Sequence, residues 1–229
     1  FHTMEALERH QGHFYNWYDT QSLKPLPPTY ISTVDSGNLA GHLLTLRPGL
    51  LALHDHRILE ARWLDGLSDT LGILVDAAGG AAAAPLAQLQ KDLAPLSASP
   101  PTTLAGARQH LEQLAKATAE VVNSLDADAE SQTMGWAHAL ARQCRGALDE
   151  LTFLAPWTLL PAAPARLSAF RGLDEVPTLR ELARFEMEVL PAIEDRLGSD
   201  ATPEERKWLE QVRPLVTESS LRAKDRMAA

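Results

Sequence analysis

The sequence predicts an all-α protein. Leucine and alanine recur at alternating spacings of three and four residues along several long segments, which is the period of an amphipathic helix. Prolines and short polar stretches separate these segments, as expected for turns between helices. Because no segment shows a convincing two-residue alternation, we expect no strands and a core made by helices packed on helices.

The N-terminal part is expected to place a polar loop between two helices. Residues 1–10 have the pattern of the end of a helix, which Gly12 breaks. The three prolines within residues 23–30 predict an extended or turning connection. A second helix should then start at a cap provided by Thr33, Asp35 or Ser36, and Pro48 should kink or restart it.

The middle of the chain is expected to be a bundle of amphipathic helices. Residues 58–78 and the shorter segment 86–93 have helical spacing, and residues 94–103 predict a loop. Residues 104–125 and 131–154 carry the clearest three-four repeats, separated by a short turn. Two long amphipathic helices with so short a connection should pack as an antiparallel αα-hairpin.

The C-terminal part predicts two further helices. Residues 179–197 have inward-facing apolar positions, and Pro191 should kink this helix. Pro203 suits the first turn of the last helix, which Pro214 should kink in turn.

Composition excludes several classes of function. The 229 residues carry a net charge of −9 without a cluster of lysine and arginine, so we expect neither a nucleic-acid partner nor direct contact with a membrane. No run of about 18 apolar residues predicts a membrane-spanning helix. Cys144 is the single cysteine, which rules out a disulfide within the chain and a cysteine-based zinc site.

Two groups of histidines are candidate metal ligands. His10 lies three residues before His13, and His54 and His56 flank Asp55 near a helix junction. Neither group has a further Glu or His at helical spacing to complete a site. We therefore expect no metal and no other cofactor, and we interpret these histidines as solvated or hydrogen-bonded.

The stretch from Gly12 to Gly41 has the composition of a sugar-binding site. It holds five of the chain's thirteen aromatic residues, set among carboxylates, amides and turn-forming residues. Aromatic rings pack on the apolar faces of sugars, and carboxylates and amides bind their hydroxyl groups. The alternative is that the aromatics fill the core and that Asp35 or Ser36 merely caps a helix. The residues expected to contact substrate are Asn16, Trp17, Tyr18, Asp19, Asp35, Ser36 and Asn38.

Residues 13–44, HFYNWYDTQSLKPLPPTYISTVDSGNLAGHLL, resemble a segment of bacterial cyclic β-1,2-glucan synthases. The similar segment begins their glucoamylase-like region, between a membrane glycosyltransferase and a phosphorylase-like part. A looser pattern, an aromatic run that ends in aspartate and is followed by Ser-Thr-x-Asp, is similar to β-1,2-glucanases and corresponds to residues 18–19 and 32–35. Elsewhere the resemblance covers mainly the order of the helices and residues 151–157.

The resemblance implies part of an (α/α)6-barrel that binds β-1,2-glucan and closes linear chains into rings by transglycosylation. Residues 1–60 would supply the first barrel helices and the motif loop. Residues 61–157 would form an inserted helical subdomain with the αα-hairpin, and residues 158–229 further helices. The main catalytic glutamates of the family are expected beyond Ala229, so the catalytic residues stay unknown. In this interpretation, the stretch from Gly12 to Gly41 lines the substrate cleft.

The resemblance also implies a setting for the chain. Because it starts at Phe1 in what has the pattern of a helix, we expect a piece of a longer protein. The parent would be a bacterial inner-membrane protein with this soluble segment on the cytoplasmic side. Its partners would be β-1,2-glucan and the remaining domains of the same polypeptide. The alternative, suggested by the αα-hairpin and the missing catalytic pair, is a non-catalytic helical scaffold or interaction module.

Overall fold

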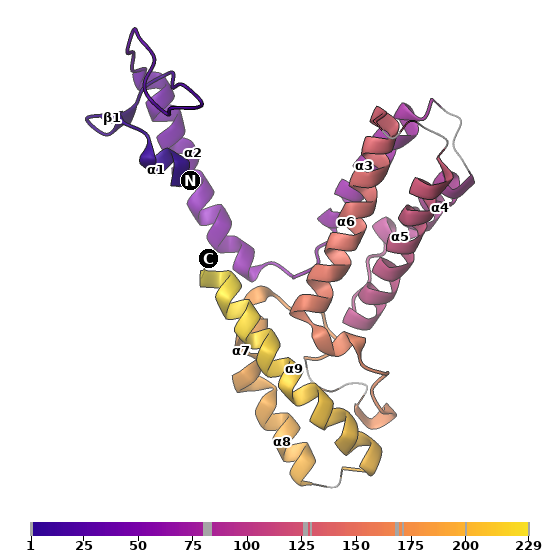
Figure 1. Cartoon of the computed structure of the whole chain (residues 1–229). Coiled ribbons are helices and arrows are strands. Elements are labelled where there is room, and N and C mark those ends of the chain that lie inside the picture. Colours follow the sequence, from indigo (N-terminus) through magenta and orange to yellow (C-terminus); the bar gives the residue numbers. More distant parts are fainter. Residues whose placement is uncertain are drawn as a thin grey trace. The chain divides into compact units, whose positions relative to one another are not determined.

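The computed structural model confirms the all-α fold class (Figure 1). It describes residues 2–79, 84–125, 128, 130–167, 170, 172–199 and 201–228. The chain divides into two compact units, Phe1–Leu53 and His54–Ala229. The predicted organisation into residues 1–60, 61–157 and 158–229, and the barrel to which they would contribute, stay predictions.

The first unit begins with a short helix and a small hairpin rather than with one helix. Helix α1 spans His2–Ala6, and strands β1 (Arg9–His10) and β2 (His13–Phe14) pair antiparallel. The predictions of a helix over residues 1–10 and of no strand were therefore wrong. The physical reason is the turn at Gln11 and Gly12, whose φ angles of 50° and 88° suit a tight two-residue hairpin loop.

Helix α2 (Thr33–Ala52) is the main element of the first unit. Its cap is Ser32, whose hydroxyl accepts from the Asp35 backbone N–H, so the predicted caps at 33, 35 or 36 were wrong. Pro48 lies inside the helix, which does not restart there. Within this unit none of the residues of α2 is buried, and Leu44 is 76% exposed.

The second unit starts with four helices that share one core. They are α3 (Arg62–Ala77), α4 (Ala84–Ala98), α5 (Leu104–Ser124) and α6 (Gln132–Leu154). Helices α5 and α6 pack along each other, as their three-four repeats predict, and α3 packs on α6. Helix α4 extends beyond its predicted end with Pro95 inside it, so the loop predicted from residue 94 begins only after Ala98.

The buried faces of these helices are the predicted apolar ones. Leu140 and Cys144 of α6 have no exposed surface, and Leu111 and Leu114 of α5 are each 2% exposed. Burial raises the pKa of the Cys144 thiol to about 11, so it is protonated at neutral pH. Cys144 is thus a core residue rather than a nucleophile.

The C-terminal part of the second unit is a group of helices, of which the last packs against the end of α6. The 3₁₀ helices η2 (Pro156–Leu159) and η3 (Ala165–Leu167) lead to α7 (Leu179–Glu188), α8 (Leu190–Gly198) and α9 (Pro203–Ala228). The expected kink at Pro191 is a break at Val189, which separates α7 from α8. Helix α9 packs on α7, α8 and η2, and Ser219 donates to the Leu154 carbonyl at 2.5 Å.

Candidate functional site

The predicted substrate-binding residues lie in the first unit, on a loop that joins β2 to α2 and on the first turns of α2. Backbone hydrogen bonds hold the two arms of this loop together. Asn16 N–H donates to the Tyr30 carbonyl at 2.9 Å, and Leu26 N–H donates to the Trp17 carbonyl at 3.0 Å. The loop is therefore an ordered structure with its own internal hydrogen bonds.

The tip of the loop is built around Asp19. One oxygen of its carboxylate, Oδ1, accepts from the backbone N–H of Gln21 at 3.1 Å and from both the N–H and the hydroxyl of Ser22, at 2.6 and 2.7 Å. These bonds, the Ser22 N–H foremost, hold the pKa of Asp19 below its usual value. An ionised carboxylate used in this way shapes a turn and is unsuited to act as a general acid.

Tyr18 fastens the loop to the preceding hairpin. Its hydroxyl accepts from the Tyr15 backbone N–H at 2.9 Å and donates to the Glu8 carbonyl at 2.7 Å. The Tyr15 and Tyr18 rings also meet edge to face, with centroids 6.2 Å apart. Both hydrogen-bonding functions of the Tyr18 hydroxyl are thus used inside the protein.

Asn16 connects the loop to the start of α2. Its side-chain carbonyl accepts from the Ser32 backbone N–H at 2.8 Å, and its amide donates to Asp35 Oδ2 at 3.1 Å. Asp35 sits in the first turn of α2, where a negative charge interacts favourably with the helix dipole. Two halves of the motif that are 19 residues apart in sequence therefore meet at this contact.

Trp17 and Tyr30 form the exposed part of the loop. Their rings are stacked, with centroids 6.0 Å apart and planes inclined by 28°. Each of the two residues is 54% exposed. Because so much of their apolar surface faces solvent, the alternative in which these aromatics fill a core does not describe this pair.

The last two predicted residues lie on α2. Ser36 is half-buried and its N–H donates to the Ser32 carbonyl at 3.0 Å, whereas Asn38 is exposed. Asn38 follows Asp35 by three residues, so the two share one helix face. Ser32 and Tyr30 also belong to the site, although neither is among the residues that the sequence predicts to contact substrate. A Ser-x-x-Asp capping pattern at residues 32–35 could have identified Ser32.

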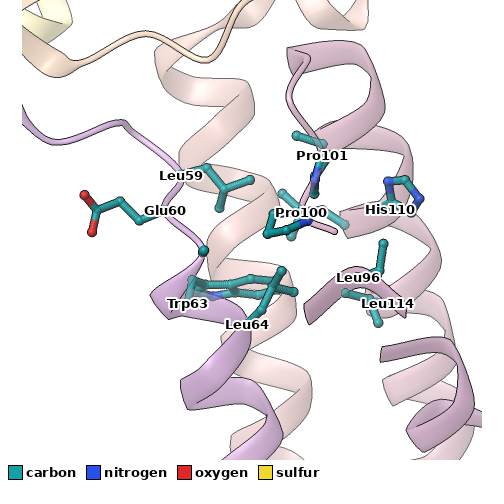
Figure 2. Close-up of a pocket in the computed structure, with 12 residues that line it drawn as sticks. Leu59, Glu60, Trp63, Leu64, Leu96, Pro100, Pro101, His110 and Leu114 are labelled. Atoms are coloured by element: carbon teal, nitrogen blue, oxygen red, sulfur yellow. The ribbon is translucent and has the colours of Figure 1, made fainter. Parts of the chain in front are cut away.

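Neither of two cavities in the second unit is lined by a predicted site residue. Figure 2 shows Leu59, Trp63, Pro100 and His110 around one of them, which has a volume of about 30 Å3. A cavity of that size holds one or two water molecules and no sugar ring. A larger cavity of about 730 Å3 is bordered by Arg57, Phe185 and three glutamates, Glu175, Glu181 and Glu188.

The part of the chain that the structure describes holds neither a cluster of metal-binding side chains nor a membrane-spanning helix. There, no three side chains of histidine, cysteine, aspartate or glutamate gather as a possible metal site. Nor does any described helix combine the length and apolar character needed to cross a bilayer.

Comparison with known proteins finds a similarity over part of the chain. Over 76 residues, a third of this chain, the sequence is 38% identical to the cyclic β-(1,2)-glucan synthase NdvB of Rhizobium meliloti strain 1021. The match spans only 3% of the length of that protein. No family model matches the chain. The chain is therefore similar in part to a cyclic glucan synthase.

Proposed function

We propose that this chain is a segment of a cyclic β-1,2-glucan synthase, that its loop binds β-1,2-glucan and that it contributes to ring closure by transglycosylation. The observation that carries the proposal is the contact between Asn16 and Asp35, at 3.1 Å. It joins the two halves of the motif into one surface. The partial similarity to a cyclic glucan synthase supports the choice of substrate.

The chemistry of this surface suits a sugar chain. Trp17 offers an apolar ring to pyranose faces, and Asn38 on α2 offers an amide for hydroxyl groups. The loop is already held by hydrogen bonds before any ligand arrives. Such pre-organisation lowers the entropy cost of binding.

We propose that this chain contributes to ring closure by holding the glucan. Breaking and remaking a glycosidic bond requires two carboxyl groups in distinct roles. Asp19 is committed to its turn and has a lowered pKa, so it does not suit the acid. We propose that the catalytic carboxyls come from other domains of the same polypeptide, in a bacterial inner-membrane protein with this segment on the cytoplasmic side.

Calorimetric titration of the 229-residue chain with linear β-1,2-glucan oligosaccharides tests the proposal. We expect saturable binding that is lost in Asp35→Ala, because this change removes the acceptor for Asn16. Asp225→Ala, which removes an exposed carboxylate on α9, is the matched control and should bind as the original chain does. Failure of the folded chain to bind any of these oligosaccharides would overturn the proposal.

A non-catalytic helical scaffold is the second candidate, and the exposed apolar surface of α2 is the observation that favours it. Its leucines are exposed within their own unit, including Leu44 at 76% and Leu50 at 50%. An apolar helix surface of this kind is typical of protein contacts. Light scattering distinguishes the two: a self-associating chain that binds no glucan favours the scaffold, and a glucan-binding monomer contradicts it.

A further inference from the structure

The polar side chains of the loop are largely occupied by the protein itself. Asn16, Tyr18 and Asp19 all hydrogen-bond to backbone groups, and Asp35 accepts from Asn16. A sugar hydroxyl would have to compete with these internal partners. Giving up an intramolecular bond offsets much of what the new bond would contribute. Four residues expected to contact substrate are thus better suited to holding the loop in shape.

In contrast to these polar side chains, the aromatic pair Trp17 and Tyr30 leaves much of its surface available to a ligand. Trp17 and Tyr30 contact each other on one side, yet each keeps more than half of its surface in solvent. The backbone of Trp17 is fixed by Leu26 N–H, and the carbonyl of Tyr30 is fixed by Asn16 N–H. Two exposed rings are therefore presented side by side on an ordered loop, and together they leave apolar surface uncovered.

We propose that Trp17 and Tyr30, here called the aromatic platform, are the surface that contacts the glucan, and that Asn16, Tyr18 and Asp19 position it. This inference rests on the proposed function. Pyranose rings stack on the free ring surface through their apolar C–H faces, and rigid aromatic side chains lose little conformational entropy when they bind. Tyr30 is thereby assigned a role in binding that its place in the sequence did not suggest.

The platform also defines the class of sugar that it should accept. In β-glucose every ring hydroxyl is equatorial, so both faces of the ring present C–H groups. Mannose carries an axial hydroxyl at C2, which projects from one face and disturbs close stacking. A surface that recognises ring faces should therefore prefer linear β-glucans to β-mannans of equal length, whereas a surface that recognises only the number of hydroxyls should not.

The test compares binding by single variants in the 229-residue chain. Trp17→Ala and Tyr30→Ala should each weaken binding of linear β-1,2-glucan about tenfold, and Trp17→Phe and Tyr30→Phe should stay within about threefold, because they keep a ring. Phe153→Ala, which removes a 43% exposed ring from α6, is the matched control and should leave binding unchanged. A β-1,4-mannan oligosaccharide should bind about tenfold more weakly than a β-1,4-glucan oligosaccharide of equal length, because the two differ only in the orientation of the C2 hydroxyl.

Fluorescence provides a readout that does not require the alanine variants to fold. Glucan should shift the emission of the exposed Trp17, and the shift should vanish in Trp17→Phe. One outcome separates the two proposals: the chain binds glucan and Asp35→Ala abolishes binding, but the platform variants change neither binding nor emission. In that case the role given to Trp17 and Tyr30 is wrong and the proposed function stands. Equal binding of the mannan and the β-1,4-glucan also overturns that role. Absence of any glucan binding overturns both.

Discussion

Replacing Asn16 by alanine should loosen the loop from α2. The change removes the acceptor of the Ser32 N–H bond, at 2.8 Å, and the donor of the bond to Asp35, at 3.1 Å. A neutral bond contributes about 1 kcal/mol, and the exposed bond to the carboxylate adds about 0.5 kcal/mol after discounting for solvent. The total of about 1.5 kcal/mol corresponds to an opening of the loop that is about tenfold more frequent.

Residue-resolved hydrogen exchange of the Ser32 amide measures this opening directly. Its rate should rise about tenfold in Asn16→Ala, because the amide loses its protecting acceptor. Asn38→Ala is the matched control: among the described residues, the Asn38 side chain makes no hydrogen bond, so the Ser32 rate should not change. Equal rates in the two variants, or an unchanged rate in Asn16→Ala, would refute the role given to Asn16.

Three further predictions concern the second unit and can be checked by urea unfolding. Leu140→Ala should lower its free energy of unfolding by about 3 kcal/mol, because Leu140 has no exposed surface, whereas Leu221→Ala at a 57% exposed position should cost under about 0.5 kcal/mol. Thr178→Ala should cost about 1 kcal/mol by breaking the capping box with Glu181, and Thr178→Ser should largely restore it. The hydrogen bond from the Thr202 N–H, and to a smaller extent the charges of Arg196 and Arg166, hold the pKa of Glu205 below its usual value. The contribution of the Glu205 carboxylate to stability is therefore complete above the pKa of the unfolded state and is lost as the pH falls. The difference in stability between the original chain and Glu205→Gln should therefore shrink as the pH is lowered below about 4.3, and a difference that grows would contradict this.

The helices of the second unit could be predicted because their signals are local and repeated. The three-four spacing of leucines defined α5 and α6 to within a residue or two at each end. Ser131 marks the start of α6 by accepting from the Met134 N–H, a bond between close neighbours in sequence. Burial then follows the same spacing, since one face of each helix must leave water.

The candidate site could be only partly predicted, because its decisive contacts join residues that are distant in sequence. The residue types of Asn16 and Asp35 suggested sugar chemistry, but no periodic pattern indicates that they bond to each other across 19 residues. The stacking of Trp17 on Tyr30 depends likewise on how the intervening loop folds. The hairpin at residues 9–14 was missed because strands of two residues are too short to show alternation.

Because Cys144 is buried, the rate at which its thiol is alkylated measures how often the helices around it separate. A protonated thiol without exposed surface reacts with an alkylating reagent only when the surrounding helices separate. The 53 residues of the first unit contain no cysteine, so the label reports on the second unit alone. The rate of alkylation, measured by mass spectrometry, would therefore report how often the helical core of the second unit opens. It would not report motions of the loop or of α2.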